Sequence, residues 1–166
     1  MSFLHSADDD PKRANRRPLL FFVLVTSAVG AAASVFTEPN IAGWYAGLVH
    51  PSFAPPNWVF APVWATLYVV MAVAAWRVWR VAGTKSLEIS IYILQLIFNF
   101  AWSAIFFAAH RIELAFAEIC ILVALVLTTT ILFWKRDRLA GWLFLPYLGW
   151  TSFAAFLTYA FWTLNP

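Results

Sequence analysis

The chain alternates between long apolar runs and short polar connections. After a charged start, five stretches with few Asp, Glu, Lys or Arg residues follow one another. About 20 helical residues cross the roughly 30 Å hydrocarbon core of a bilayer. Backbone polar groups in lipid need partners within their own segment, and the runs lack the alternation of a β-barrel, so they predict helices. The expected spans are residues 18–36, 58–81, 87–109, 114–134 and 139–162.

Composition supports a membrane protein. Of the 166 residues, 63% are hydrophobic and 11% are charged, which is too little charge to cover a water-soluble globule of this size. We therefore expect an all-α membrane protein, with one five-transmembrane-helix bundle over residues 18–166. Residues 1–17 are expected to form a flexible polar tail.

The basic residues predict an orientation. Ten of the eleven lie in the tail and in the second and fourth connections, and the remaining one is Arg111. By the positive-inside rule, the N-terminus is cytoplasmic and the C-terminus is outside, with the cell membrane as the expected location. Because the basic residues form short clusters rather than one continuous face, they do not indicate a nucleic-acid partner.

The first connection, residues 38–57, is long and unusually stiff. It contains Trp44, Tyr45 and Phe53 together with four prolines. A long ordered loop in a compact bundle more often covers a site than links two elements. We expect this loop to form a lid on the outer side of the membrane.

Aromatic and polar residues recur at helical spacing in three of the spans. The residues concerned are Trp64 and Tyr68 in the second span, Asn99, Trp102 and Phe106 in the third, and Trp150 and Ala154 in the fifth. Intervals of three and four place each set on one helix face. An amide at bilayer depth normally turns inward, so these faces predict a shared pocket. A lining of indoles, a phenol and an amide suits a large, flat, apolar ligand.

Other interpretations of these residues stay open. Tryptophan also forms belts at membrane interfaces, and about half of the ten tryptophans are expected there. His5, His50 and His110 show no helical ligand spacing, and the single cysteine excludes a CxxC site, so no structural metal is expected. Coordination of a ligand's iron by His50 or His110 is a minor alternative. Glu118 is either a functional intramembrane carboxylate or a residue near the outer interface.

Three long motifs follow one another along the chain. They read WYAGLVHPSFAPPNWVFAPVWATLY (44–68), QLIFNFAWSAIFF (95–107) and DRLAGWLFLPYLGWTSFAAFLTYAFWTLN (137–165). In order and spacing they resemble the signature blocks of the TspO/MBR family of tryptophan-rich sensory proteins. The resemblance implies a five-helix bundle whose pocket, under the first loop, binds porphyrins such as protoporphyrin IX, and in some members sterols. It also implies a homodimer, for which the third helix is the expected seam.

The resemblance extends the set of expected ligand-binding residues. The full set comprises Trp44, Phe60, Trp64, Tyr68, Asn99, Trp102, Phe106, Trp150, Phe153 and Ala154. The resemblance implies a porphyrin as the ligand, and no cofactor is expected to be required. Some bacterial members promote light- and oxygen-dependent porphyrin breakdown, for which Trp64 or Trp150 would be the reactive side chain. The chain departs from the family pattern at Ser52 and Phe53, where many relatives have tryptophan.

The residues, together with the family resemblance, suggest three functions. The leading expectation is a porphyrin-binding membrane receptor or regulator. The first alternative is an enzyme that photo-oxidises its bound tetrapyrrole, and the second is a tetrapyrrole or sterol transporter. Five helices without charged inward pairs or an inverted repeat offer little mechanism for alternating access. No basic residue follows Tyr159, so the cholesterol-recognition pattern is not supported.

Overall fold

The fold is a bundle of five long helices. The computed structural model describes residues 17–166, and the expected polar tail lies outside them except for Arg17, the first residue of a helix. In chain order the elements are α2 (Arg17–Ile41), the 3-10 turn η1 (Tyr45–Gly47), α3 (Asn57–Ala82), α4 (Leu87–Ser103), the π-helical turn η2 (Ala104–Ala108), α5 (Ile112–Arg136) and α6 (Arg138–Leu164). With α4 and η2 counted as one span, five helices are long and apolar enough to cross a membrane. The predicted five-helix membrane bundle is confirmed.

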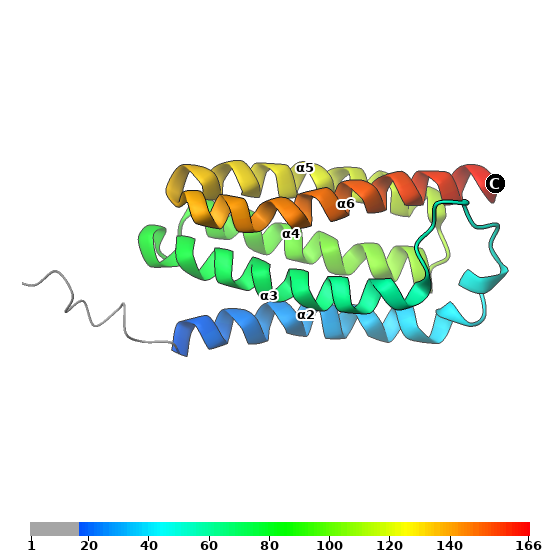
Figure 1. Ribbon diagram of the computed structural model, residues 1–166, viewed down its shortest axis with the longest axis horizontal. Helices are drawn as coiled ribbons and strands as arrows, with labels where there is room; N and C mark the ends of the chain where they lie inside the picture. The colour runs from blue at the N-terminus through cyan, green and yellow to red at the C-terminus, as the bar shows by residue number, and fades with distance from the viewer. Residues whose placement is uncertain (1–16) are drawn as a thin grey trace, which may run out of the picture.

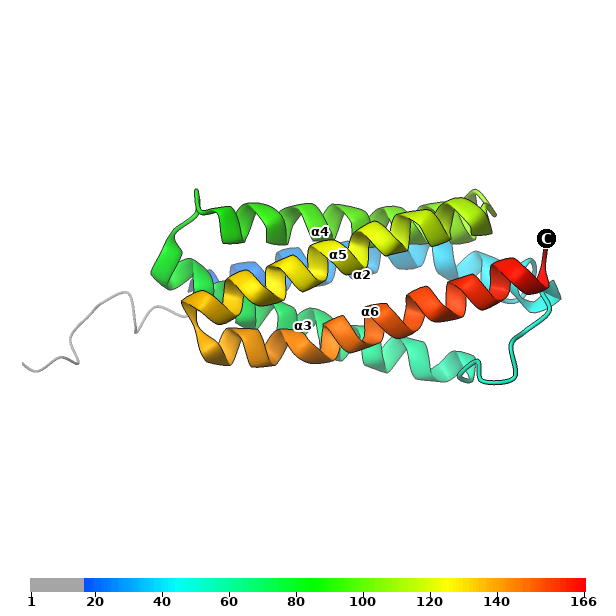
Figure 2. The same cartoon turned by 90° about the horizontal axis from the view of Figure 1, so that it is seen from above.

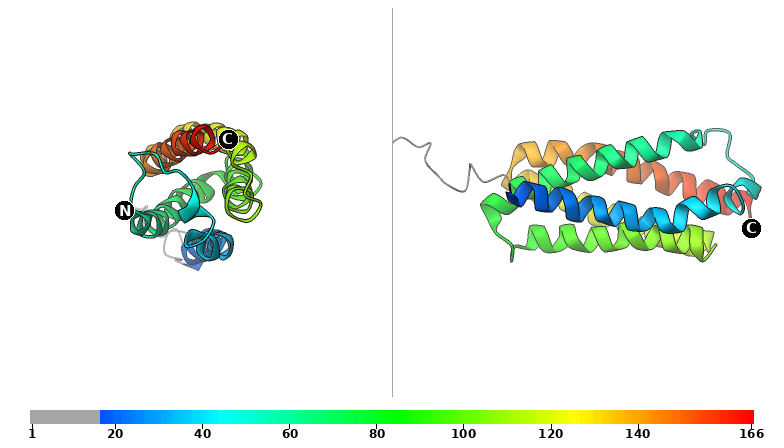
Figure 3. Two further views of the ribbon diagram at one scale, coloured as in Figure 1. Left: turned by 90° about the vertical axis from the view of Figure 1, so that its right-hand side faces the viewer. Right: turned by 90° about the horizontal axis from the view of Figure 1, so that it is seen from below.

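The five helices enclose a common interior. They lie side by side along the long axis (Figures 1 and 2), and the end-on view in Figure 3 shows them arranged around a centre. Contacts between helices follow the order α2, α3, α6, α5, α4 and return to α2. Two of these contacts, α3 with α6 and α2 with α4, join helices that are not consecutive in the chain.

The two ends of the bundle differ. One end, here called the loop end, carries the connection of residues 42–56, the turn between η2 and α5, and the end of α6 (Figure 1). The opposite end, here called the basic end, carries the start of α2, the connection between α3 and α4, and the connection between α5 and α6. Most of the basic side chains of the described residues lie at this second end.

Short polar signals terminate the helices at the basic end. Gly83 follows α3 with a φ of 80°, a conformation that glycine adopts at no steric cost. The hydroxyl of Ser86 accepts a hydrogen bond from the backbone N–H of Ile89 and caps α4. The carboxylate of Asp137 accepts hydrogen bonds from the N–H groups of Leu139 and Ala140, at 2.9 and 3.1 Å, and caps α6. These caps allow tight antiparallel turns.

The first span is longer than the sequence predicts. The expected end at Phe36 is wrong, because α2 continues to Ile41 and includes Pro39. The side-chain amide of Asn40 donates to the carbonyl of Phe36, at 2.9 Å, within this additional turn. The connection that follows is therefore residues 42–56 rather than 38–57. The other four spans have bounds within two residues of those expected.

The third span ends in a π-helical turn that the sequence does not signal. The backbone N–H of Ala109 donates to the carbonyl of Ala104, at 2.9 Å, five residues earlier. Such a turn is wider than an α-helical one and often occurs at functional sites. Phe106 and Phe107 are consecutive, yet both are buried. The wider turn brings both rings against the interior of the bundle.

Candidate functional site

A cavity of about 330 Å³ lies in the half of the bundle nearest the loop end. All five spans and Tyr45 of η1 contribute to its lining. Eight of the ten residues expected to bind a ligand line it, namely Phe60, Trp64, Tyr68, Asn99, Trp102, Phe106, Trp150 and Ala154. Its volume is within the range typical of small-molecule sites. The faces expected to meet therefore do meet.

Trp44 and Phe153 do not line this cavity, although both were expected to be ligand-binding residues. The indole of Trp44 stacks on the imidazole of His110, with ring centroids 4.3 Å apart, and forms a T-shaped pair with Phe106. Phe153 packs beside Trp150, with centroids 5.6 Å apart. Consecutive helical residues point about 100° apart, so Phe153 lies away from the face that Ala154 presents. Both residues therefore pack against side chains that line the cavity, Trp44 against Phe106 and Phe153 against Trp150.

The aromatic rings of the cavity contact one another, both within a span and between helices. Trp64 stacks on Tyr68, with centroids 5.5 Å apart, and Trp102 stacks on Phe106 at 5.2 Å. The ring of Phe60 in α3 meets the indole of Trp150 in α6 edge-on at 5.8 Å. Aromatic pairs in such geometries each contribute about 1 kcal/mol beyond the area they bury. The packing fixes the ring orientations before any ligand arrives.

A buried chain of hydrogen bonds runs inward from the cavity. The hydroxyl of Tyr68 donates to Asn99 Oδ1 at 2.5 Å, and Asn99 Nδ2 donates to the hydroxyl of Tyr147 at 3.0 Å. Tyr147 in turn donates to Gln95 Oε1 at 2.9 Å. Tyr68 and Asn99 line the cavity, whereas Tyr147 and Gln95 are fully buried and do not. The chain ties α3, α4 and α6 together and fixes two lining residues.

Two indole N–H groups lack acceptors. Within the part of the chain that the structure describes, Trp102 Nε1 and Trp150 Nε1 are buried without a hydrogen-bond partner. A buried donor without an acceptor costs about 1–3 kcal/mol, so an acceptor on a ligand would relieve this cost. Both tryptophans line the cavity. Two of the lining side chains therefore carry a donor that no residue of the described range uses.

Small residues of α2 form one wall of the cavity, although they were not among the residues expected to bind a ligand. Gly30, Ala33 and Ser34 line the cavity. A methyl group at position 30 would overlap the ring of Tyr68, so the close approach of α2 and α3 requires glycine there. The run of small residues from Ser27 to Ser34 was the available signal. It indicated close neighbours but not which side of α2 faces a cavity.

The connection of residues 42–56 crosses the loop end of the bundle, as the left view of Figure 3 shows. Tyr45 is buried among the rings of Phe106, Phe107 and Phe161, and this burial raises the pKa of its phenol. The imidazole Nε2 of His50 lies 3.0 Å from the carbonyl oxygen of Tyr45. The connection is therefore held by packing and hydrogen bonds at its centre.

The charged and metal-binding candidates are few. Among the described residues that line the cavity, Glu38 is the only charged one. No group of three His, Cys, Asp or Glu side chains that could hold a metal ion occurs within residues 17–166. Glu118 is 8% exposed, and neither of its carboxylate oxygens has a hydrogen-bond partner in that range. It is buried within the bundle and does not line the cavity.

Comparisons with known proteins identify the family. The model of the TspO/MBR family matches residues 22–163, which include all or most of each of the five helices. The chain belongs to the TspO/MBR family. Its relatives in this family include the protein CrtK of Rhodobacter capsulatus, with 35% identity over 150 residues, covering 89% of this chain and 91% of the relative.

Further TspO/MBR relatives come from animals and bacteria. The translocator protein of Sus scrofa is 35% identical over 152 residues, covering 89% of this chain and 90% of the relative. The tryptophan-rich sensory protein of Cereibacter sphaeroides is 35% identical over 144 residues, covering 87% of this chain and 90% of the relative. Because these alignments extend over nearly the whole of each chain, the TspO/MBR similarity includes every helix that lines the cavity.

Proposed function

We propose that this chain is a membrane receptor for porphyrin-like tetrapyrroles, which bind in the cavity beneath residues 42–56. The observation that carries the proposal is the convergence of Trp64, Trp102 and Trp150, from three different helices, on one cavity. Two of these indoles, Trp102 and Trp150, have buried N–H groups without an acceptor in the described range. A flat macrocycle could stack on the rings and accept hydrogen bonds from the indoles. The names of the relatives, a sensory protein and a translocator protein, support a ligand-responsive membrane function.

The charge of the cavity indicates how a porphyrin would be oriented. No lysine or arginine occurs among the described lining residues, and Glu38 lies in α2 close to the loop end. Burying a carboxylate without a cationic partner is costly. The propionate groups of a porphyrin would therefore lie at the mouth of the cavity, in water, with the apolar edge of the ring directed inward. Binding would order residues 42–56 above the ligand and change the surface that partners meet.

Tryptophan fluorescence tests the proposal. In purified protein, protoporphyrin IX should quench the intrinsic fluorescence with a saturable dependence on concentration. The double variant Trp64→Phe/Trp150→Phe should weaken binding about ten-fold, because two stacking indoles and one indole donor are lost. The matched control is Trp58→Phe/Trp142→Phe, which removes two exposed indoles that do not line the cavity. Unchanged affinity in the folded Trp64/Trp150 variant would place the ligand elsewhere.

Illumination separates a receptor from an enzyme. If the protein is only a receptor, the absorption bands of bound protoporphyrin IX should decay in light and air no faster than those of free porphyrin in detergent. Faster decay that disappears in the Trp64→Phe or Trp150→Phe variant would support the photo-oxidative alternative instead.

The homodimer through α4 stays a prediction, and the exposed Ile93, Leu94 and Ile97 are the side chains it would cover.

A further inference from the structure

A second hollow lies at the basic end of the bundle, on the opposite side of the molecule from the cavity. It is formed where α3 ends, α4 begins and α5 ends. Its lining consists of Ala82, Ser86, Leu87, Glu88, Leu132, Lys135 and Arg136, here called the rim hollow. None of these residues has a part in the function proposed above. The rim hollow combines apolar and cationic side chains within one small concave surface.

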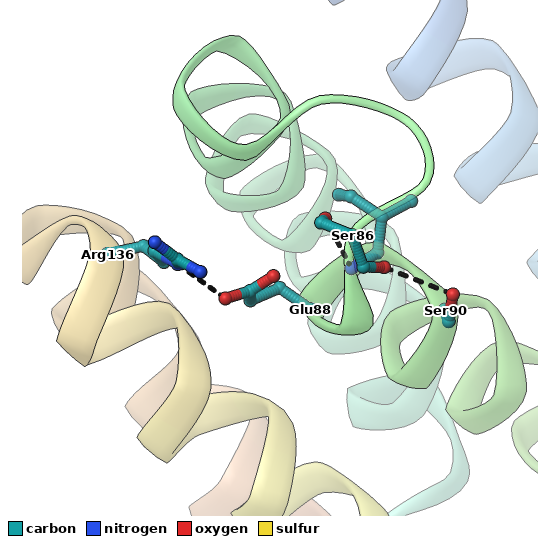
Figure 4. A network of polar contacts seen from close by, with 5 residues as sticks. Ser86, Glu88, Ser90 and Arg136 are labelled. Atoms are coloured by element: carbon teal, nitrogen blue, oxygen red, sulfur yellow. Dashed lines mark hydrogen bonds and ion pairs between the residues drawn. The ribbon is translucent and has the colours of Figure 1, made fainter.

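The acidic residue of the rim hollow is already neutralised. Arg136 Nε of α5 donates to Glu88 Oε1 of α4 at 2.5 Å, as Figure 4 shows. The side chain of Glu88 is buried, whereas half of the Arg136 side chain is exposed. The guanidinium has two further nitrogens, for which residues 17–166 provide no hydrogen-bond or ion-pair partner. These nitrogens can bind another anion without breaking the pair with Glu88.

Lys135 adds a second cation beside Arg136. Its side chain is exposed and makes no hydrogen bond or ion pair with another residue of the described range. Because Glu88 balances one of the two cations, the rim hollow keeps a net charge of about +1. An arginine and a lysine that converge on one hollow suit a phosphate group, since arginine can donate two parallel hydrogen bonds and lysine supplies a compact charge.

Apolar side chains complete the rim hollow on the side of the bilayer. Leu87 is 63% exposed, and it is the first residue of a membrane span. Leu132 lies one turn before Arg136 at the end of the next span. The boundary between the apolar spans and the polar connections therefore passes through the rim hollow. A ligand that fits both parts has an anionic head and a hydrocarbon tail.

We propose that the rim hollow binds the headgroup of one anionic phospholipid. The phosphate would lie between Lys135 and the free nitrogens of Arg136, and an acyl chain would run along Leu87 and Leu132. Basic pockets between transmembrane helices commonly bind anionic headgroups on the cytoplasmic side of membranes. Such a lipid would join the start of α4 to the end of α5, which are already connected by Arg136 and Glu88.

The charge distribution of the whole bundle favours an anionic membrane surface at this end. Of the described residues, the basic end carries Arg17, Arg77, Arg80, Lys85, Lys135, Arg136 and Arg138 against Glu88 and Asp137. Among residues 17–166, the loop end carries Arg111 against Glu38 and Glu113. Positively charged segments favour the cytoplasmic leaflet, in which anionic lipids are enriched. The rim hollow is therefore placed where its ligand would be most abundant.

Native mass spectrometry of the full chain in detergent tests the proposal. Phosphatidylglycerol should add one molecule per chain at low concentration, and phosphatidylcholine should bind more weakly. Lys135→Gln should reduce the affinity for phosphatidylglycerol roughly five-fold, because one cation near a headgroup contributes about that factor. The matched control is Lys85→Gln, which removes the same charge from an exposed residue at the same end but outside the rim hollow. It should change the affinity less than two-fold.

The outcomes distinguish the proposal from its competitors. If Lys85→Gln and Lys135→Gln reduce the affinity for phosphatidylglycerol equally, general surface charge, and not the rim hollow, attracts the lipid. Glycerol 1-phosphate that competes as well as phosphatidylglycerol would identify a site for free phosphate and overturn a lipid site. A Lys135→Gln variant with the same affinity for phosphatidylglycerol as the parent protein would also overturn the proposal. Because Lys135 is exposed and unpaired within the described residues, this variant should keep the thermal stability of the parent protein in the absence of lipid.

Discussion

The side-chain amide of Asn165 binds both backbone polar groups of Val49. The N–H of Val49 donates to Asn165 Oδ1 at 2.8 Å, and Asn165 Nδ2 donates to the carbonyl of Val49 at 3.1 Å. These two residues are 116 positions apart in the chain. The pair attaches the connection above the cavity to the end of α6, so one amide adds to the packing that holds this connection.

Replacing Asn165 should loosen the connection over the cavity. Asn165→Ala removes both hydrogen bonds to Val49, and an exposed pair of this kind contributes about 1 kcal/mol. We expect the amides of residues 42–56 to exchange with solvent roughly five-fold faster. Hydrogen exchange measured by mass spectrometry reports this change. Thr163→Ala is the control, because its hydroxyl donates only to the carbonyl of Ala160 within α6. Equal exchange in parent and Asn165→Ala would show that packing alone holds the connection.

The buried hydrogen-bond chain predicts an order of stability among three tyrosine variants. Tyr147→Phe should destabilise the protein most, since this hydroxyl accepts from Asn99 and donates to Gln95. Tyr68→Phe removes one hydrogen bond and should cost about 1 kcal/mol. Tyr159→Phe, at an exposed phenol with no hydrogen bond in the described structure, should be neutral. Thermal unfolding in detergent gives the order, and a Tyr147→Phe variant as stable as Tyr159→Phe would contradict it.

Replacing either of two glycines in the membrane-spanning helices with alanine should have opposite effects on the stability of the protein. Gly30→Ala places a methyl group into the ring of Tyr68, and separating α2 from α3 to accommodate it should cost about 1–3 kcal/mol. Gly149→Ala meets no atom within 4 Å and should be neutral or slightly stabilising, because alanine favours the helix. Unfolding midpoints of the two variants provide the comparison. A harmless Gly30→Ala would indicate that α2 and α3 are loosely packed at this point.

Acidification should weaken the turn between α5 and α6. Burial alone would raise the pKa of Asp137, but hydrogen bonds from the N–H of Ala140 and from Arg77 outweigh it and hold the pKa below its usual value. Arg77 Nη2 lies 2.8 Å from Asp137 Oδ2. A carboxyl whose pKa is lowered on folding stabilises the protein above its unfolded pKa of about 3.9, and this stabilisation is lost as the pH falls through the folded value.

The pH prediction is tested with an isosteric variant. Between about pH 5 and about pH 2, the melting temperature of the parent protein should fall more steeply than that of Asp137→Asn, since asparagine still caps α6 but does not titrate. Glu113→Gln, at an exposed carboxyl in the first turn of α5, is the control and should follow the parent curve. Parallel curves for the parent protein and Asp137→Asn would exclude a contribution from this carboxylate.

Much of the cavity could be predicted because its helices obey a simple period. Trp64 and Tyr68 are four residues apart, as are Trp150 and Ala154, and such pairs share a helix face wherever the helix lies. Trp44 could not be placed in this way, because a connection has no fixed period and its ring direction depends on contacts with His110 and Phe106. Tyr147 was missed because its role arises from a hydrogen bond to Asn99 on another helix.

The sequence by itself determined the five spans and the residues that share a face within each of them. Both follow from local rules, since every backbone group in lipid must be paired within its helix and side chains repeat with the helical period. Only the tertiary structure decided which faces meet, that α2 supplies a wall through Gly30, and that α4 ends in a π-helical turn. These features depend on contacts between residues far apart in the chain, whose packing is set by the shapes of neighbouring helices and not by any local pattern.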